Sequence, residues 1–281
     1  MPGLRFVTDS TADLDPGYRE RERILTVPLK VNFGDESLVD GVDIDAEHFY
    51  ARMRESTRNP TTSQPTPAEF EAAFRDAGGD GSTVICTTMS SEMSGTHGAA
   101  LTAREALPDL DIRVIDTRTV SIGHHLLVIN AIERARQGAG ADEVVDHIGD
   151  LIRRQSSIFT VPTLEYLRRG GRIGGARALL GSVLNIKPVL SVLDGRIEPH
   201  DKVRTYQRAL ERIADELISA VGESGRKARA VVGHADKLDD CRTVAERIAP
   251  HCAVTPALIE IGPIVGCHAG PGLIGLSFHL D

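Results

Sequence analysis

His268 stands out among the residues that could do chemistry, because a dense cluster of glycines and prolines surrounds it. It lies in the run Ile261–Gly272, where five Gly or Pro residues fall within five positions of the histidine. Glycine permits backbone conformations that other residues avoid, and proline fixes the backbone angle φ. A neutral imidazole can donate and accept hydrogen bonds near physiological pH. The run therefore indicates either a tight turn with a surface histidine or a backbone shaped around a functional side chain.

Two further hydroxyl side chains lie at or near positions where helices are expected to begin. Ser94 precedes Gly95 and Thr96, and a helix is predicted to start at Ser94. Backbone amides at a helix N-terminus favour anions, and a serine there adds a hydroxyl donor; an ordinary N-cap also accounts for the serine. Thr62 lies a few residues before another predicted helix start, where the same alternative applies. Together, Thr62, Ser94 and His268 suggest a polar cluster for one carboxylate.

Two arginines lie in turn-like or strand-end positions from which a long side chain can reach outward. Arg172 follows two glycines, and Arg204 follows Lys202 and Val203. A solvated surface charge is the ordinary interpretation of such residues. Arginine also suits phosphate recognition, because its planar guanidinium can pair with two oxygens at once. The residues alone leave both interpretations open.

Several other kinds of site are excluded by the sequence. Residues 270–275 formally match the dinucleotide-binding pattern G-x-G-x-x-G, but only six residues follow, which leaves no room for the helix and acidic residue that the pattern needs. No Walker A sequence occurs. The four cysteines form no C-x-x-C pair, so neither a zinc knuckle nor a thioredoxin-like motif is predicted, and no metal site is expected. These cysteines are Cys86, Cys241, Cys252 and Cys267.

The composition is that of a folded protein with a substantial core. The chain has 281 residues, a hydrophobic content of 41% and a formal net charge of −8. This acidic balance argues against general nucleic-acid binding. No apolar run approaches the roughly 20 residues of a membrane span, and the N-terminus has no signal-peptide pattern. We therefore expect a cytoplasmic protein with no integral membrane segment.

Strands alternate with helices in the first half of the chain, which is typical of a mostly parallel sheet. Strands are predicted at residues 4–8, 24–33, 83–88 and 112–116. Helices are predicted at residues 45–56, 66–79, 94–106, 121–137 and 142–155. Thr66, Pro67 and Glu69 fit a helix start with an N-cap, a proline in first position and a capping-box glutamate.

The second half is predicted to be mixed α/β with an antiparallel element. Extended segments are predicted at residues 157–161, 188–193, 196–197, 228–233, 258–261 and 273–279. Helical segments are predicted at residues 164–169, 176–184, 206–221 and 238–248. The Asp194–Gly195 turn favours a hairpin. We predict an α/β fold with two domains: a mostly parallel-sheet N-terminal domain, residues 1–155, and a mixed-sheet α/β C-terminal domain, residues 156–281.

Five sequence blocks, in order and spanning nearly the whole chain, resemble the DegV family of bacterial fatty-acid-binding proteins. Each block alone is a weak signal, whereas five in order are a strong one. Asp9 and Ser10 belong to the first block, but no role is assigned to them. The blocks are Thr8–Leu14, Thr61–Pro67, Ser90–Thr96, Leu164–Ile173 and the run around His268.

The resemblance implies a lipid-binding carrier without a cofactor or catalytic residue of its own. It implies that the motif residues Thr62, Ser94 and His268 hold a fatty-acid carboxylate, together with the adjoining Ser63, Gly95 and Thr96. Around His268 the family's usual threonine-like neighbours are replaced here by Cys267 and Ala269. The lipid site is expected at the interface of the two domains.

The resemblance also implies a protein partner. In the family, a dihydroxyacetone-kinase-like fatty acid kinase phosphorylates the bound carboxylate to an acyl phosphate. Arginines at the motif positions of Arg172 and Arg204 serve the exchange with that kinase. These two arginines are therefore expected to be exposed near the mouth of the lipid site.

A long-chain fatty acid is a physically sensible ligand. Burying about fifteen methylenes at roughly 0.8 kcal/mol each gives about 12 kcal/mol before the costs of association. Several apolar residues could line a tunnel, although plain core packing is the more ordinary interpretation of each. These candidates are Leu126, Leu127, Ile129, Leu180, Val183 and Leu184.

Two alternative functions come from other classes. One is a hydrolase or acyltransferase with Ser94 as nucleophile and His268 as base. The sequence lacks the G-x-S-x-G elbow, but catalytic triads are defined by geometry. The other is a transcriptional or partner-binding regulator, which the acidic charge and the absence of a DNA-binding motif disfavour.

Overall fold

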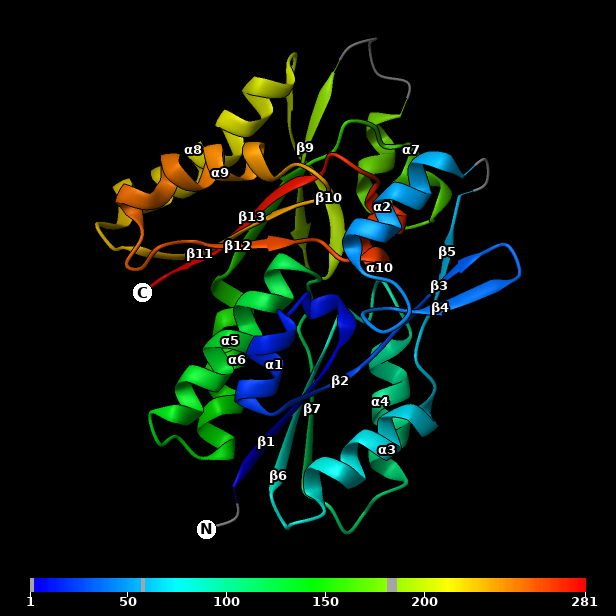
Figure 1. Ribbon diagram of the computed structural model, residues 1–281. Helices are drawn as coiled ribbons and strands as arrows, with labels where there is room; N and C mark the ends of the chain where they lie inside the picture. Colours follow the sequence, from blue (N-terminus) through cyan, green and yellow to red (C-terminus); the bar gives the residue numbers. More distant parts are fainter. Residues whose placement is uncertain (1–2, 57–58, 181–185) are drawn as a thin grey trace.

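The computed structural model describes residues 3–56, 59–180 and 186–281. Figure 1 shows the parallel sheet of the N-terminal half below and the mixed sheet of the C-terminal half above. Both sheets carry helices, so the predicted α/β class and the two kinds of sheet are confirmed. The division at residue 155 stays a prediction.

The N-terminal sheet has four parallel strands in the order β2-β1-β6-β7. Successive strand residues point to opposite faces. Phe6 therefore packs against α5 and α6, whereas Val7 packs against α3 and α4. The strands are β1 (Leu4–Asp9), β2 (Ile24–Val27), β6 (Thr83–Thr88) and β7 (Ile112–Asp116). The helices around them are α1 (Pro16–Glu22), α3 (Pro67–Gly78), α4 (Thr96–Glu105), α5 (Ile122–Arg136) and α6 (Ala141–Arg154).

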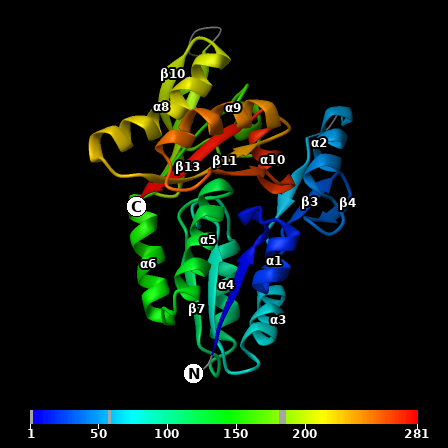
Figure 2. The same cartoon turned by 60° about the vertical axis from the view of Figure 1, so that its left-hand side comes forward.

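The C-terminal sheet has six strands in the order β10-β9-β8-β13-β11-β12, and only β11 and β12 pair in parallel. Helices α8 (Tyr206–Ser224) and α9 (Leu238–Ile248) cover one face, as the turned view in Figure 2 shows. The strands are β8 (Ser156–Thr160), β9 (Lys187–Leu193), β10 (Arg196–Val203), β11 (Ala228–His234), β12 (Ala257–Glu260) and β13 (Ile274–Leu280). The predicted hairpin is confirmed, with a longer second strand.

Helix α5 joins the two sheets. Its residues Ile122 and Leu126 pack with Val231 and Ile259 of the C-terminal sheet, while Leu127 packs in the N-terminal core. One helix thus contributes to both cores, and its first turn lies where the two parts of the chain meet.

A third, small antiparallel sheet has the order β4-β3-β5. Its strands are β3 (Lys30–Phe33), β4 (Glu36–Val39) and β5 (Thr61–Ser63), and α2 (Ala46–Glu55) follows β4. The predicted single strand at residues 24–33 is wrong, because Pro28 separates β2 from β3 and the two strands join different sheets. Proline has no amide hydrogen and interrupts a strand ladder. Strand β5 was not predicted.

Short helices complete the fold. They are η1 (Ser10–Ala12), α7 (Glu165–Arg169), η2 (Gly174–Leu179), η3 (Ala249–His251) and α10 (Pro263–Ala269). The predicted helix at residues 176–184 is only a 3-10 helix ending at Leu179, and residues 181–185 lie outside the described part. His268 lies on α10, not in a tight turn: Pro263 is at the helix start and Gly270, with φ of 79°, follows its end.

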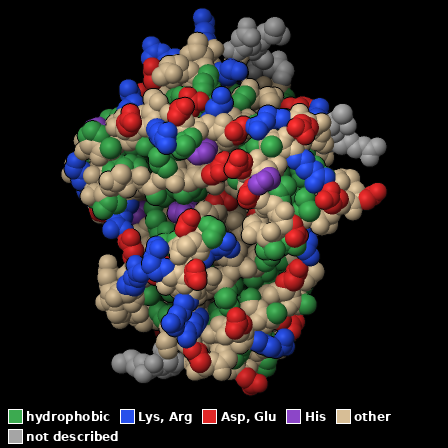
Figure 3. All heavy atoms as spheres, in the orientation of Figure 1, with side chains coloured by type: hydrophobic (Ala, Val, Ile, Leu, Met, Phe, Trp, Pro, Cys, Tyr) green, Lys and Arg blue, Asp and Glu red, His purple; other side chains and the backbone are tan. Residues whose placement is uncertain are grey.

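Charged side chains of both signs are interspersed on the face drawn in Figure 3. Acidic side chains gather near the middle of this face, where elements of the two parts meet. Burial raises the pKa of Glu260, and the carboxylates of Asp236, Glu47 and Asp45 raise it further.

The buried carboxyl group of Asp40 predicts a pH-dependent stability. Burial raises the pKa of Asp40 to about 7, against the lowering effects of the Ser10 hydroxyl and of Arg19. Its contribution to stability is present below the pKa of the unfolded chain and is lost as the pH rises through about 7. Asp40→Asn should therefore gain about 2 kcal/mol relative to the wild type between about pH 5 and pH 8 in urea unfolding.

The neighbouring exposed Asp43 supplies the control, because Asp43→Asn changes a carboxylate that is in water. A difference between Asp40→Asn and the wild type that stays constant over this pH range would contradict the prediction.

Candidate functional site

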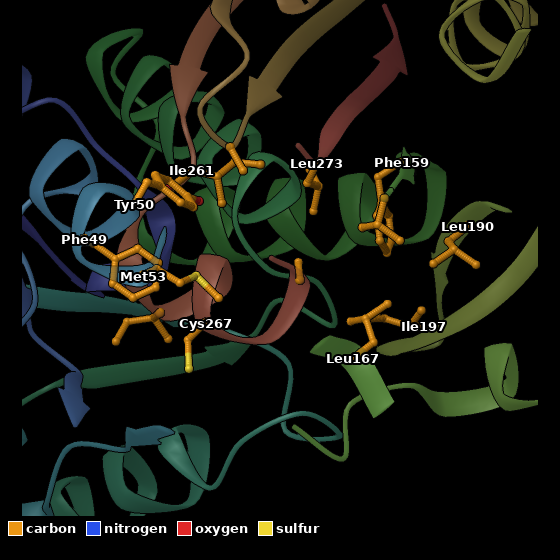
Figure 4. Packing of buried hydrophobic residues seen from close by; sticks show 14 of the residues in the cluster. Phe49, Tyr50, Met53, Phe159, Leu167, Leu190, Ile197, Ile261, Cys267 and Leu273 are labelled. Carbon is orange, nitrogen blue, oxygen red and sulfur yellow. The ribbon is translucent and has the colours of Figure 1, made fainter. Parts of the chain in front are cut away.

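A cavity of about 810 Å³, part of it open to solvent, is lined by residues from both halves of the chain. Most of its wall is apolar, and several wall residues belong to the hydrophobic cluster in Figure 4, where Leu273, Phe159, Ile197 and Leu167 face a common interior. The apolar wall consists of Leu29, Met89, Met93, Val120, Ile122, Phe159, Leu167, Val192, Ile197, Ile261, Ile264, Val265, Ala269 and Leu273.

The other residues lining the cavity are polar. Thr62, Ser94, Arg172 and His268 form the group that we call the polar end, and Ser121 and Ser157 also line the wall. Thr62 Oγ1 lies 2.8 Å from Nε2 of His268, so one hydrogen bond joins residues 206 positions apart in the sequence. The three residues from which the sequence predicted a carboxylate cluster therefore line the same cavity, and two of them are in direct contact.

Strand β5 turns Thr62 toward the cavity. It pairs with β3, where Val31 is opposite Thr62. Because neighbouring strand residues point to opposite faces, Ser63 points the other way, and its hydroxyl accepts a hydrogen bond from Asn32 Nδ2 at 2.9 Å. The structure does not bring Ser63 to the cavity.

Helix α10, which carries His268, packs against two neighbouring segments. A Cβ at Gly266 would come within 2.5 Å of the Tyr50 hydroxyl, so α2 lies directly against the helix. Tyr50 also donates to the carbonyl oxygen of Ile261 at 2.9 Å. On another side, a Cβ at Gly170 would come within 2.3 Å of Nδ1 of His268. The absence of a side chain at Gly170 therefore allows the turn after α7 to pack closely against the imidazole.

Ser94 lies just before helix α4, whose N-cap is Gly95. The Ser94 hydroxyl is 2.8 Å from the Thr96 hydroxyl and accepts a hydrogen bond from the Thr96 amide at 3.3 Å. No side chain caps this helix start at Gly95. A Cβ at Gly95 would come within 2.3 Å of the Gln64 side chain. The runs around Thr62 and Ser94 are therefore packed together.

Arg172 connects the polar end to the surface. Its guanidinium donates to the carbonyl oxygen of Gly170 at 2.7 Å and to that of Met93 at 3.1 Å. The residue is exposed and also lines the cavity. It lies on the turn after α7, so four sequence motifs contribute to one end of the cavity.

His268 is a neutral hydrogen-bonding group in this environment. Burial, with a smaller effect of the charge of Arg172, lowers its pKa to about 4. Its Nδ1 atom is buried and has no hydrogen-bond partner among the described residues. The neighbouring Cys267 is not activated as a nucleophile, because burial raises the pKa of its thiol to about 12. Its Sγ atom lies 3.0 Å from the carbonyl oxygen of Pro60.

The remaining predicted site residues lie outside the cavity wall. Gly95 is exposed, and Thr96 is buried beneath Ser94. Arg204 is exposed just after β10, and it is not among the residues that line the cavity. The family resemblance grouped Arg172 with Arg204, whereas the structure places only Arg172 at the polar end.

The suggested tunnel wall is wrong for the residues that the structure describes. Leu126 and Leu127 are buried in other clusters, and Ile129 packs beside them. Leu180 is exposed. Val183 and Leu184 lie outside the described residues. Helix α5 does contribute to the cavity, but through Ile122 in its first turn, whereas the sequence pattern marked all its apolar residues alike.

The sequence missed most of the apolar wall. Part of it had a signal: Met93 and Val265 lie within the same short runs as Ser94 and His268. Others, such as Phe159 and Val192, come from near strand ends, and their convergence depends on how the sheets pack. Strand alternation alone assigns a residue to a face, and it does not say which face meets a cavity.

The arrangement does not form the catalytic pair that a hydrolase would need. The Ser94 hydroxyl contacts Thr96, and His268 Nε2 contacts Thr62. Throughout the described ranges, no hydrogen bond joins Ser94 to His268. A nucleophile within hydrogen-bond reach of its base is the signature of this chemistry, so the hydrolase alternative gains no support.

None of the helices in the described residues is long and apolar enough to cross a membrane. In the same ranges, no group of three or more His, Cys, Asp or Glu side chains is arranged to hold a metal ion.

Comparisons with known proteins point to one family. The family model of DegV, described as a family of uncharacterised proteins, matches residues 4–281. A DegV domain-containing protein of Halalkalibacterium halodurans is 34% identical over 283 residues, which cover 100% of both chains.

Solved structures give the same result. A DegV family protein from Thermus thermophilus, described by its fatty acid binding, superposes with a TM-score of 0.93 at 32% identity, covering 99% of this chain and 100% of that one. A protein from Eubacterium ventriosum described as binding stearic acid gives a TM-score of 0.90 at 27% identity, covering 99% of this chain and 98% of that one.

The environment of His268 predicts an unusual titration. Without ligand, its imidazole should stay neutral from about pH 5.5 to pH 8, because its pKa is lowered to about 4 whereas an ordinary histidine titrates near 6.5. Nitrogen NMR of the ring measures this directly. Exposed His48 is the internal control, because hydrogen bonding to Asp45 raises its pKa above the ordinary value. A His268 ring that gains a proton near pH 6.5 would show that water reaches it freely.

Proposed function

The chain belongs to the DegV family, and on this premise we propose that it binds a long-chain fatty acid in the cavity and presents its carboxylate to a fatty acid kinase. The observation that carries the proposal is an apolar cavity in which hydroxyl, imidazole and guanidinium groups gather at one end. A fatty acid has the same division between an apolar chain and one charged group.

The apolar wall supplies the driving force. Each methylene that leaves water contributes about 0.8 kcal/mol, so a chain of about fifteen carbons outweighs the cost of association. The stearic acid of the Eubacterium ventriosum protein is a ligand of this size class. The apolar wall is mostly aliphatic, and flexible Met89 and Met93 can adapt to an alkyl chain.

The polar end supplies donors for the carboxylate. A carboxylate that leaves water is costly unless several donors meet it. The hydroxyl groups of Thr62 and Ser94 line the cavity, and the start of α4, whose N-cap Gly95 has no side chain, adds backbone amides that favour an anion. Neutral His268 can donate one hydrogen bond, and Arg172 adds a positive charge at the surface.

Presentation to a kinase requires that the headgroup be reachable from outside. Arg172 is exposed and lines the cavity, so it lies where a partner could meet the bound carboxylate. We propose that Arg204, exposed after β10, contacts the kinase without touching the lipid. The proposal places this exchange in the cytoplasm and makes the chain a carrier with no catalytic residue.

The first test is the ligand itself. We expect the purified protein to carry fatty acid from its expression host, visible as an adduct of fatty-acid mass in native mass spectrometry.

Ser94→Ala should weaken binding by about 1–3 kcal/mol, because a charged ligand loses a hydrogen-bond donor. Ser91→Ala is the matched control, since Ser91 is exposed, binds Asp116 and does not line the cavity.

A clean apo spectrum that gains no mass when oleate is added would refute fatty-acid binding. Equal affinities for Ser94→Ala and Ser91→Ala would instead remove Ser94 from the site. The parent protein and both variants should leave a chromogenic ester intact. Turnover of the ester by the parent alone would support the hydrolase alternative.

The second test separates lipid binding from presentation. Arg204→Ala should leave the affinity for oleate unchanged and slow acyl-phosphate formation by a fatty acid kinase by about tenfold, since a charge at the edge of an interface governs association with the partner. Arg204→Lys should restore only part of the rate, because an ammonium lacks the guanidinium fork.

Lys202→Ala is the matched control, as an exposed cation two residues away. If Arg204→Ala loses oleate as well, the arginine supports the lipid site or the fold. If it forms acyl phosphate at the parent rate, it has no part in the exchange.

A further inference from the structure

The opening segment, Asp9–Asp13, carries three hydrogen-bonding side chains and one backbone carbonyl that together contact three residues of the cavity wall and the start of α10. The segment follows β1 and forms the short helix η1. It does not line the cavity itself. These contacts give the first sequence block a structural role, although none of its residues belongs to the polar end.

Asp9 holds the segment after β6. Its side chain is fully buried, and its carboxylate accepts a hydrogen bond from the Met89 amide at 2.7 Å. It also accepts from the Thr11 amide at 2.9 Å and from the Thr11 hydroxyl at 2.6 Å. Three donors are the arrangement that a buried carboxylate needs. Because Met89 lines the cavity, Asp9 fixes one wall.

Ser10 and Thr11 reach two further wall residues. The Ser10 hydroxyl accepts a hydrogen bond from the Leu29 amide at 3.1 Å. The Thr11 carbonyl oxygen accepts one from the Ser121 amide at 3.0 Å. Leu29 and Ser121 both line the cavity.

Asp13 connects the polar end to the first turn of α5. One carboxylate oxygen accepts a hydrogen bond from the Gly262 amide at 3.0 Å, and the other accepts one from the Ser121 hydroxyl. Gly262 is the N-cap of α10, the helix that carries His268. A Cβ at Gly262 would come within 2.6 Å of the Asp13 carboxylate, so the contact leaves no room for a side chain.

Both residues of the contact between Asp13 and Ser121 have strained backbone conformations. Asp13 has φ of 48° and Ser121 has φ of 52°, a region that residues other than glycine rarely adopt. Such conformations persist only where the surroundings determine them more strongly than local preference does. Here the hydrogen bond between the two strained residues is one such determinant.

We propose that the opening segment is the positioning element of the fatty-acid site, and that Asp13 fixes the helix of His268 relative to the cavity wall at Ser121. Asp13 is then a positioning residue that never touches the lipid. The proposal rests on the fatty-acid binding proposed above. It predicts a loss of affinity that is larger for a ligand with a carboxylate than for the same chain without one.

The experiment compares Asp13→Ala and Asp13→Asn with Asp116→Ala as the matched control. Asp116 also accepts hydrogen bonds at a strand end, from Ser91 and from the Arg118 amide, but none of these residues lines the cavity. Affinity is measured for oleate and for oleyl alcohol, well below the melting temperature of each variant.

We expect Asp13→Ala to bind oleate about tenfold more weakly, a typical size of coupling between residues in one hydrogen-bonded network. Its affinity for oleyl alcohol should change much less. Asp13→Asn should restore most of the oleate affinity, because its carbonyl oxygen can accept the Gly262 amide while its amino group meets the Ser121 hydroxyl. Asp116→Ala should lose stability and keep its affinity for both ligands.

Each other outcome has a distinct meaning. If the parent protein binds no oleate, the proposed function fails, whatever the variants do. If the parent binds oleate and Asp13→Ala binds it equally well, or if Asp13→Ala and Asp116→Ala lose equal affinity for both ligands, the positioning role is refuted.

A second variant keeps the test open if Asp13→Ala does not fold. Ser121→Ala removes the hydroxyl from the same contact and leaves the carboxylate on Gly262. It should shift the NMR signals of the His268 ring relative to the parent and weaken oleate binding. Unchanged ring signals would overturn the proposal.

Discussion

For the proposed fatty-acid site, the cost of taking a carboxylate out of water is the strongest constraint. An apolar cavity can hold an alkyl chain at any point along its wall, but it can hold a carboxylate only where donors have been assembled. In this chain the donors come from four sequence motifs, on β5, before α4, after α7 and on α10. No single element could present them all, because Thr62 and His268 are 206 residues apart. The packing of three sheets and α10 can be understood as the means of bringing these groups to one place.

Glycines make this convergence sterically feasible. At Gly170 a side chain would occupy the position of the His268 ring, and at Gly95 it would occupy that of the Gln64 side chain. Neither residue has a positive φ, so the requirement is the close approach of two segments and not backbone conformation. A glycine-rich motif in a sequence is usually interpreted as a turn. Here these two positions mark where one motif packs directly on another, which is why the motifs occur together.

The fold class followed from the sequence because alternating strands and helices, capping residues such as Thr66 and the Asp194–Gly195 turn are local signals. Local signals marked Thr62, Ser94 and His268 one by one and suggested a polar cluster, and the family resemblance then implied that the three meet at one carboxylate, which was a demanding prediction. Strand alternation could have removed Ser63, which has the opposite orientation to Thr62. No local signal could have shown that Leu126 and Leu127 do not line the cavity. A helix that is buried on several sides has apolar residues on each of those sides, so its sequence does not say which of them face a cavity. The helix at α10 had a signal that was overlooked, namely a proline at its start and a glycine after its end.

Arg172 and His268 together suit a proposed carrier that must both hold and release its ligand. The charge of Arg172 lowers the pKa of His268, as burial also does, so the histidine meets a carboxylate as a neutral donor and not as an ion-pair partner. A neutral hydrogen bond is weaker than a charge-assisted one, so this contact holds the headgroup less tightly. The positive charge lies instead on an exposed guanidinium at the edge of the cavity, where solvent screens it and a second protein can reach it. Affinity then comes mainly from the apolar chain, whose burial does not depend on the headgroup, and the headgroup is left open to chemistry by a partner.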